Sequence, residues 1–566
     1  MYYVFLVGVT EISLFFTVTI YYRTNSTKFG LRVSDVSCGL SIRNHVESKQ
    51  RMLSPSASLF VARASSLRPR CAPKVLWSGS VLFDDDDDRA ERPSSPRPGS
   101  VVINTSGQIE ACIGQHVSSH QAKHYADLHN YEFVNLGEDT CLSPGLIDVH
   151  THISEMGGRN WEGYYTATRA AAAGGLTTIM GMPLNSLPPT TTLDAVDMER
   201  TAANSYSLAC DVGLWGGVLD DTSIETLTEL VSSPFVFGIK AFLAPLPPNA
   251  GYQAVTPQQL KIAADICGPA HKPILVHSEL MTHQESLQAA DEAFERHGNN
   301  DASYMAHVES RPPEWERAAV QVVADLCDRC DMHVVHLSDA EGCLPIIQAA
   351  KANNRHEKAS QHRLTVETCP HYLLLTAKDI PDGDTRFKCF PPIRSANNQR
   401  LLKEALRSGL IDMIASDHSP CDASMRKRAE LDMRRAWGGL SGLQYQLPAT
   451  MQAMEAVVTN DPQSMMATWW SRNPSLLVPG LAKSKGCIQN GKQADLVAWD
   501  SSFVGPPTSY SSEHHRWKGD CVYTDMSLRG RVMGTWLAGM QVYDGETDSF
   551  PHENDRVGSV LMCERR

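Results

Sequence analysis

The sequence predicts an α/β fold: a (β/α)8 TIM barrel with a small β-sandwich domain formed by the N- and C-terminal flanks. From residue 143 to about residue 450, eight short apolar runs alternate with segments of helical period. Such alternation is typical of a parallel sheet covered on both faces, and eight such units close a barrel. Strand patterns return on both sides of this region, which predicts that the flanks pair into one accessory domain.

The composition is that of a globular protein. A length of 566 residues accommodates one large barrel and an accessory domain, and 42% hydrophobic with 20% charged residues is ordinary. The net charge of −13 argues against a nucleic-acid partner, because nucleic-acid binders usually present a basic face. Fifteen cysteines without a repeated spacing favour free thiols in a reducing compartment. We therefore expect a cytoplasmic protein.

Residues 1–57 differ from the rest and predict an atypical extension, either disordered or used for targeting. Residues 2–22 are mostly apolar and about long enough to span a bilayer, but Glu11 in their middle is costly in hydrocarbon. No basic residue precedes them, as one would in a signal peptide. The Arg- and Ser-rich residues 52–70 leave a transit-like segment or an alternative start open. Membrane contact is expected only if residues 2–22 are a real anchor, and import into an organelle stays an alternative.

The flanks carry the predicted sandwich. Its first part covers residues 58–142, with strand patterns beginning at Ser58, Lys74, Ser80 and Ser100. Residues 84–88 are five consecutive carboxylates, which repel one another and predict a solvated loop, with a calcium site as the alternative. The second part covers residues 473–545, with strand patterns at residues 494–499, 530–536 and 541–543. The polar residues 546–566 predict a loose C-terminal tail.

The barrel is predicted over residues 143–472. The β runs begin at Gly145, Thr177, Cys210, Val236, Pro273, His333, Leu364 and Ile411. Segments of helical period lie between them, including residues 161–173, 193–205, 257–266, 313–327 and 397–408. In this fold the carboxyl ends of the strands form the active-site face.

Metal-binding side chains recur at those carboxyl ends. In His150-Thr-His152 the two imidazoles lie two residues apart on a strand, so they point the same way. Each such residue alone has a structural explanation, such as a hydrogen-bonded histidine, a buried ion pair or a helix cap. Together, at one rim and from five strands, they predict a metal site. The predicted ligands are His150, His152, Lys240, His277, His336 and Asp417.

The chemistry of this set suits two divalent metal ions. Four neutral imidazoles and a carboxylate favour zinc or a similar ion. The ammonium of Lys240 would repel metals, but after carboxylation by CO2 (N6-carboxylysine) it becomes an anionic bridging ligand. A water between two ions loses a proton near neutral pH and becomes the nucleophile. Asp417 would then take the proton from the attacking hydroxide and pass it to the leaving nitrogen.

Residues 143–545 resemble the amidohydrolase superfamily, in particular its cyclic-amidohydrolase branch and, within that branch, the allantoinases. The resemblance implies a dinuclear zinc site with a carboxylated lysine and hydrolysis of the ring amide of allantoin to allantoate in purine catabolism. It also implies a β-sandwich built by both flanks and a homotetramer. The motifs that carry it include Pro144-Gly-Leu-Ile-Asp-Val-His-Thr-His152, Met182-Pro-Leu-Asn-Ser186, Ser310-Arg-Pro-Pro313, Val366-Glu-Thr-Cys-Pro-His-Tyr372, Ser416-Asp-His-Ser-Pro-Cys421 and Ala436-Trp-Gly-Gly439.

Two absences separate this chain from the neighbouring families. Dihydroorotases hold a substrate carboxylate with an Arg two residues after the second histidine, where this chain has the uncharged Ser154. Hydantoinases and dihydropyrimidinases place a Tyr shortly after the bridging lysine, and here none follows Lys240 until Tyr252. A hydantoinase-type cyclic amidase stays an alternative. A non-catalytic scaffold on the same fold is the other, although such relatives have typically lost ligands that are all present here.

The predicted substrate contacts are Ser154, Asn185 and Ser419. The chain departs from the allantoinase pattern at residues 154–157, at residues 244–251 and at Phe390, where a small or polar residue is usual. These positions lie near the expected substrate mouth. They therefore bear on substrate and stereochemical preference more than on the metal chemistry.

Overall fold

The computed structural model divides into two compact units, residues Met1–Ser66 and Leu67–Arg566. It describes residues 5–9, 12–16, 68–69, 71–84, 95–114, 117–157, 161–184, 186–245, 253–356 and 362–563. In the first unit β1 (Phe5–Val9) pairs antiparallel with β2 (Ile12–Phe16). The rest of the predicted extension, and the strand expected at Ser58, lie outside the described residues. Within the described parts of the chain, no helix has the length and apolar character that crossing a membrane requires.

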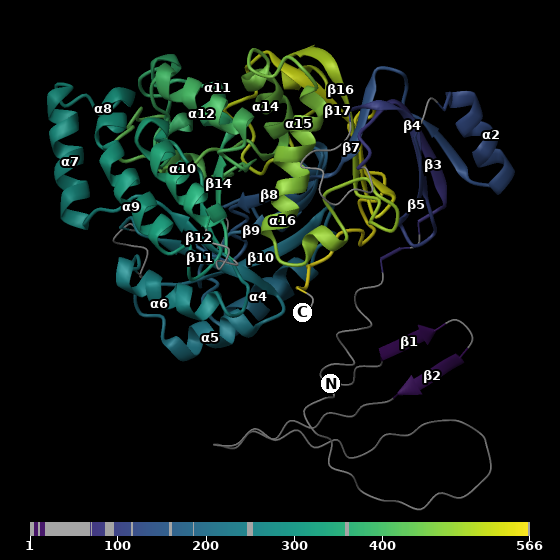
Figure 1. Cartoon of the computed structure of the whole chain (residues 1–566), viewed down its shortest axis with the longest axis horizontal. Helices are drawn as coiled ribbons and strands as arrows, with labels where there is room; N and C mark the ends of the chain where they lie inside the picture. Colours follow the sequence, from purple (N-terminus) through teal and green to yellow (C-terminus); the bar gives the residue numbers. More distant parts are fainter. Residues whose placement is uncertain are drawn as a thin grey trace, which may run out of the picture. The chain divides into compact units, whose positions relative to one another are not determined.

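The second unit contains the predicted barrel (Figure 1), which confirms the fold class. Eight strands, all parallel to their neighbours, follow one another around the sheet in chain order. They are β8 (Leu146–Thr151), β9 (Leu176–Gly181), β10 (Asp211–Gly217), β11 (Val236–Phe242), β12 (Ile274–His277), β13 (Met332–Val334), β14 (Leu364–Thr368) and β15 (Met413–Ile414).

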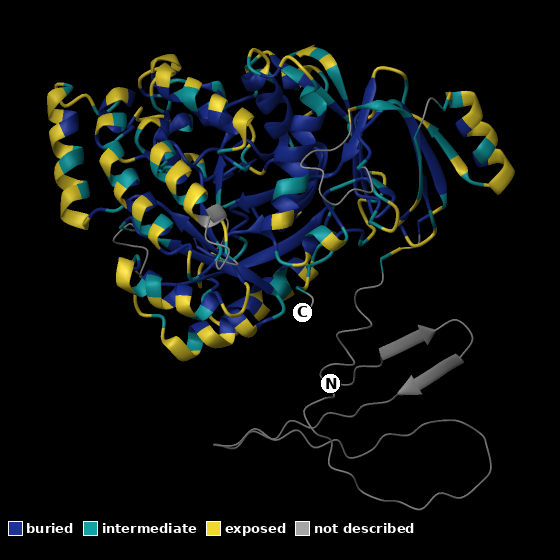
Figure 2. Ribbon diagram, viewed as in Figure 1, coloured by how far each residue is buried: buried dark blue, intermediate teal, exposed yellow. Residues whose placement is uncertain are grey.

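Helices alternate with these strands and surround them. Figure 2 shows the strands buried and the outer helix faces exposed. The helices of the barrel are α3 (Tyr164–Ala173), α4 (Leu193–Asn204), α5 (Ile224–Ser232), α6 (Pro257–Cys267), α7 (His283–Arg296), α8 (Tyr304–Glu309), α9 (Pro313–Asp325), α10 (Ala340–His356), α11 (Pro370–Leu374), α12 (Ala396–Ser408) and α13 (Ala423–Arg426). Further along are α14 (Gln446–Met454), α15 (Pro462–Ala467) and α16 (Asn473–Leu477), with single turns at Ala377–Asp379, Thr385–Phe387, Leu443–Tyr445, Thr468–Arg472, Leu481–Lys483 and Pro507–Ser509.

The barrel interior is filled by apolar side chains from its strands. Ile147, Val149, Met180, Trp215 and Phe237 belong to one buried cluster inside it. A packed interior is expected of this fold, which is a core and not a pore. The carboxyl ends of the strands, where the predicted site lies, are therefore supported by a closely packed core.

The barrel closes between its first and last strands. Thr151 and His418 form a parallel bridge, and the backbone N–H of His152 donates to the carbonyl of His418 (2.8 Å). The buried carboxylate of Asp148 accepts the backbone N–H of Ser416 (3.0 Å). This seam places the end of β8 beside the segment that follows β15, and so it sets the two predicted ligand groups side by side.

Both flanks build the second sheet, as predicted. Its strands run β18-β17-β16-β7-β3-β4-β5, and β6 pairs with β3. Strand β7 lies between β3 of the same flank and β16 from the C-terminal flank. The bounds are β3 (Lys74–Val81), β4 (Arg97–Ile103), β5 (Ile109–Gly114), β6 (Glu132–Asn135), β7 (Thr140–Pro144), β16 (Leu496–Gly505), β17 (Leu528–Leu537) and β18 (Met540–Asp544), and α2 (Ser119–His129) packs on this sheet.

The C-terminal tail corrects one expectation, because its described part is docked and not loose. Val560 pairs in parallel with Val212, and the N–H of Leu561 donates to the carbonyl of Val212 (2.8 Å). Beside this contact the fully buried Asp211 pairs with Arg68 (2.6 Å) and Lys485 (2.8 Å). These partners lie hundreds of residues apart, and the polar sequence of the tail gives no sign of them. Residues 85–88 of the acidic run lie outside the described residues.

Candidate metal centre

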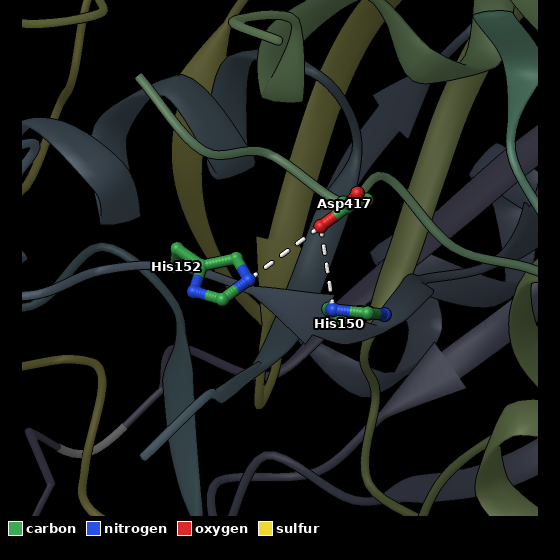
Figure 3. Close-up of side chains that lie close together, drawn as sticks. All are labelled: His150, His152 and Asp417. Atoms are coloured by element: carbon green, nitrogen blue, oxygen red, sulfur yellow. Dashed lines mark ion pairs between the residues drawn. The ribbon is translucent and has the colours of Figure 1, made fainter. Parts of the chain in front are cut away.

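The first half of the predicted site assembles at the barrel seam. Figure 3 shows His150 and His152 facing Asp417. Oδ1 of Asp417 lies 3.3 Å from Nε2 of His150 and 3.5 Å from Nε2 of His152. One ligand atom from each of the three lies within 4.8 Å of the other two, and all three residues are buried. This spacing fits a shared metal ion.

The second half is a pair of imidazoles. Nδ1 of His277 lies 3.0 Å from Nε2 of His336. Nε2 of His277 donates to the buried carboxylate of Glu279 (2.8 Å), so Nδ1 presents a lone pair toward His336. The ring centroids of His150 and His336 are 5.4 Å apart, which joins the two halves. All five residues line one cavity of about 710 Å³.

Lys240 is fully buried on β11, the strand beside His277. Its Nζ has no hydrogen-bond partner among the described residues. Burial lowers the pKa of Lys240 to about 8, although the carboxylates of Glu367 and Asp417 oppose this effect. A buried, unpaired ammonium is costly, so this position makes the amine of Lys240 easier to deprotonate, and hence to modify, than an exposed lysine.

Phe242 lies two residues after Lys240 on the same strand, and its ring stacks on the imidazole of His277. Their rings are 4.9 Å apart and nearly parallel, at 15°. The resemblance to hydantoinases predicts a Tyr shortly after the bridging lysine, whereas this chain has the ring of Phe242, which carries no hydroxyl. The ring fixes the plane of the His277 imidazole, and it offers no hydrogen bond to a substrate.

A buried carboxylate that the sequence analysis did not single out supports His150. Oε1 of Glu367 on β14 accepts from Nδ1 of His150 (2.6 Å), and its Oε2 accepts from Nε2 of His333 (2.9 Å). Burial raises the pKa of Glu367, but the two histidines outweigh burial and hold the pKa at about 2. Because the ring proton of His150 is on Nδ1, its Nε2 is available to bind a metal ion. A lone carboxylate inside the apolar run at residues 364–368 was the available signal.

The backbone is strained at the two last ligands. His336 and Asp417 have φ values of 40° and 46°, in the left-handed region that non-glycine residues seldom adopt. Both lie just after the ends of their strands. Strain of this kind tends to gather at functional sites, where the surrounding structure enforces it.

Two of the three predicted substrate contacts lie among the described residues. Ser419 lines the cavity. Ser154 is buried, and it is not among the described residues that line the cavity. Asn185 lies outside the described residues. The departure at Phe390 reaches the cavity wall, where it packs so closely that a Cβ on Gly438 would lie 2.3 Å from its ring.

A second buried cluster, Glu513, His515 and Cys521, has metal-like spacing but is already satisfied by hydrogen bonds. Nε2 of His515 accepts the backbone N–H of Gln444 (3.1 Å), so the ring proton is on Nδ1, which faces Glu513 (3.4 Å). The carboxylate of Glu513 also accepts the N–H of Gly519 (2.6 Å). With neither imidazole nitrogen available, this cluster serves as a hydrogen-bonded brace.

Comparisons with known proteins point in one direction. Residues 141–542 match the family described as the amidohydrolase family. An allantoinase of Arabidopsis thaliana is 34% identical over 485 residues, which is 84% of this chain and 90% of that protein. An allantoinase of Streptomyces avermitilis is 39% identical over 463 residues, covering 81% of this chain and 95% of that protein.

The solved structures show the same fold. An L-hydantoinase (dihydropyrimidinase) from Arthrobacter aurescens superposes with a TM-score of 0.71 and 22% identity, and covers 87% of this chain and 100% of that chain. Identity at this level supports the architecture alone.

Proposed function

The chain belongs to the amidohydrolase family, and from this premise we propose that it hydrolyses a ring amide of allantoin to give allantoate. The two relatives named above are allantoinases from a plant and a bacterium, and the similarity covers 90% and 95% of their lengths. In the reaction, water adds across a C–N bond of the ring. The hydroxyl ends on the carbonyl carbon as a carboxylate, and a hydrogen ends on the released nitrogen.

One observation carries the proposal: the two half-sites meet in one cavity, with their imidazole nitrogens and one carboxylate close together. His277 and His336 face each other at 3.0 Å, and Nε2 of His150 and of His152 both lie close to Asp417. With the proton of His277 on Nε2, its Nδ1 can accept from Nε2 of a neutral His336. A divalent cation can take the place of that shared proton, because both nitrogens then offer lone pairs, so the residues present fit two such ions.

The proposed ligands are His150, His152 and Asp417 for one ion and His277 with His336 for the other, and zinc is the proposed metal. When bound, such ions supply a nucleophilic water at neutral pH and polarise the substrate carbonyl. We propose Lys240, carboxylated, as the residue that joins both halves. The neutral amine adds to CO2, losing one proton, and becomes an anionic carbamate. The unpartnered, fully buried Nζ and its lowered pKa support this assignment.

Asp417 is the proposed proton carrier. Burial raises the pKa of its carboxyl, but the surrounding imidazoles, His150 first, outweigh burial and hold the pKa well below its usual range. The carboxylate is therefore ionised at neutral pH and can accept a proton from the attacking water. It returns that proton to the leaving nitrogen when the ring opens.

A hydantoinase-type activity is the alternative within the same chemistry. The sequence has no Tyr between Lys240 and Tyr252, and this spacing and the allantoinase relatives favour allantoin instead. A homotetramer and a cytoplasmic location are further proposals, both carried over from the family resemblance and the cysteine content.

The test is an assay of the purified full-length protein with allantoin, detecting allantoate. Hydantoin and dihydrouracil serve as comparison substrates, and Asp417→Asn serves as the inactive control. We expect turnover of allantoin that is lost in the control. Turnover of dihydrouracil or hydantoin without turnover of allantoin would overturn the proposed substrate.

A further inference from the structure

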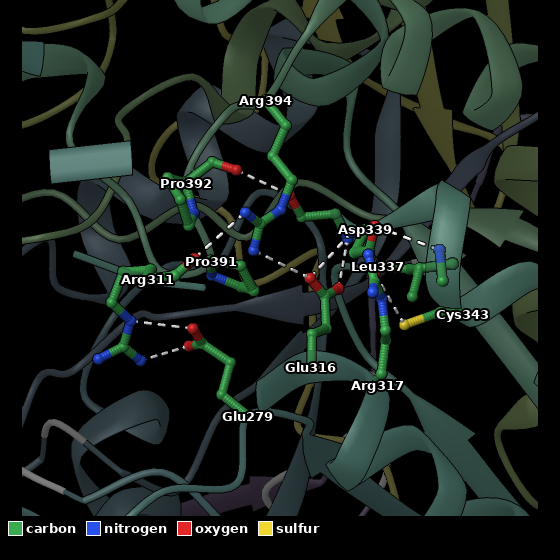
Figure 4. A network of polar contacts seen from close by, with 12 residues as sticks. Glu279, Arg311, Glu316, Arg317, Leu337, Asp339, Cys343, Pro391, Pro392 and Arg394 are labelled. Carbon is green, nitrogen blue, oxygen red and sulfur yellow. Dashed lines mark hydrogen bonds and ion pairs between the residues drawn. The ribbon is translucent and has the colours of Figure 1, made fainter. Parts of the chain in front are cut away.

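We propose that Arg311 positions the His277–His336 half of the metal centre through a buried network, and that this half therefore depends on Arg311 while the other half does not. Figure 4 shows Arg311 paired with Glu279, and Arg394 close to Glu316. The inference rests on the proposed metal-dependent function and names a positioning residue for it. Three observations support it, and each rests on hydrogen bonds between buried side chains or backbone groups.

The first link joins Arg311 to His277. Nε and Nη2 of Arg311 donate to Oε1 and Oε2 of Glu279 at 2.9 and 2.5 Å. Oε2 of Glu279 also accepts from Nε2 of His277 at 2.8 Å. A two-point guanidinium contact fixes the plane of a carboxylate as well as its charge. The proton therefore stays on Nε2 of His277, and Nδ1 stays aimed at His336.

The second link runs from Arg311 to the loop after His336. The carbonyl oxygen of Arg311 accepts from Nη1 of Arg394 (3.2 Å), and Nη2 of Arg394 lies 3.5 Å from Oε2 of Glu316. The carboxylate of Glu316 accepts the backbone N–H groups of Ser338 (2.7 Å) and Asp339 (2.9 Å). Ser338 lies two residues after His336. One network thus holds the segments that follow both histidines, and because this second link uses the backbone carbonyl of Arg311, a side-chain substitution at that position perturbs only the first link.

The third link is the contrast between the two halves. His150 is held by Glu367, whose other oxygen contacts His333, and none of these residues touches Arg311. The ring of His336 has no such support, because its Nδ1 lacks a partner among the described residues. Glu367 reaches His336 only at the backbone N–H (3.2 Å). The ion at His277 and His336 therefore depends most on the first link, the side-chain contact of Arg311 with Glu279.

Direct contact with substrate is the rival role for Arg311. Its side chain is only 10% exposed but lines the cavity, and its guanidinium lies 4.9 Å from the ring centroid of Phe390. A substrate contact would change KM and leave the ions in place. A positioning role would change the number of bound ions and leave KM nearly constant.

The experiment measures metal per chain in the full-length protein at a series of buffered free Zn²⁺ concentrations. The variants are Arg311→Gln and the milder Arg311→Lys. Arg317→Gln is the matched control. Arg317 pairs with Asp339 of the same network (2.8 Å), but its side chain is 36% exposed and makes no contact with Glu279 among the described residues. Allantoin kinetics and a melting curve are recorded for each protein.

We expect wild type and Arg317→Gln to bind two ions. Arg311→Gln should lose the second ion at about 10- to 100-fold higher free Zn²⁺ than wild type, with a fall in kcat at saturating allantoin. Arg311→Lys, which keeps the charge but not the two-point contact, should fall between them. Two ions held with wild-type affinity in both Arg311 variants, or loss of both ions together, would overturn the inference. Wild-type turnover of allantoin tests the proposed function, whereas the ion count tests Arg311, so each can fail alone.

Discussion

The support that Glu367 gives to His150 leads to a prediction with two contrasting variants. Glu367→Ala removes the acceptor of three donors: Nδ1 of His150 (2.6 Å), Nε2 of His333 (2.9 Å) and the backbone N–H of His336 (3.2 Å). All three are buried, and each donor left without an acceptor costs about 1–3 kcal/mol. We expect Glu367→Ala to lower the free energy of unfolding by about 3–9 kcal/mol in the metal-free protein.

Glu367→Gln should behave differently, because His333 can change its tautomer. Nδ1 of His333 faces the Oγ1 of Thr365 (2.8 Å), which can accept as well as donate. The Gln amide can therefore donate to Nε2 of His333 while its oxygen accepts from His150. The fold should lose at most about 1 kcal/mol, and the lost negative charge should weaken metal binding by about 10- to 100-fold.

The assays are urea unfolding of the metal-free variants and zinc competition with a chelator of known affinity. Two results would refute the reasoning. One is Glu367→Gln with wild-type metal affinity, which would make the carboxylate irrelevant to the ligand. The other is equal destabilisation by Gln and Ala, which would mean that the tautomer change does not occur.

Three further predictions concern other parts of the chain. Lys240→Ala should lose metal and activity, with partial rescue by short carboxylic acids added to the assay; full activity would rule out a bridging role. Asp211→Asn should lower the free energy of unfolding in urea by about 1.5–3 kcal/mol, because it removes the carboxylate partner of Arg68, while Lys485 keeps its ion pair with Asp495; a loss below about 1 kcal/mol contradicts this. Hydrogen bonds from Ser512 and His514 outweigh burial and lower the pKa of Asp548 to about 2, so its ionised form adds stability above about pH 4 that is lost as the pH falls through 2. Asp548→Asn should therefore cost about 1–2 kcal/mol at pH 7, discounted for a side chain 25% exposed, and nothing below pH 2, as measured by unfolding at both pH values.

The barrel was predictable from sequence because its strands are buried on both faces. Such strands are short continuous apolar runs, and β11 and β14 begin at Val236 and Leu364, where the runs predict. The candidate ligands were predictable for a related reason. They end those runs, and the parallel fold brings all strand ends to one rim.

The residues that support the ligands were not predictable in the same way. Glu279 and Glu367 act through partners on other strands, and the value of a buried carboxylate depends on which imidazole it faces. The tail is docked because Val560 pairs with Val212, and no pattern in the sequence around either residue predicts this pairing. These contacts form only in the tertiary fold, whereas the apolar periodicity and the ends of the strands can be recognised in short stretches of sequence.

The most direct test of the central claim is allantoate formation by the full-length protein before and after removal of its metal. The account predicts turnover of allantoin by the zinc-loaded protein, loss of turnover on chelation and its return when Zn²⁺ is restored. A folded protein that holds two ions and leaves allantoin unchanged, or one that turns over allantoin equally well after complete removal of metal, would contradict it.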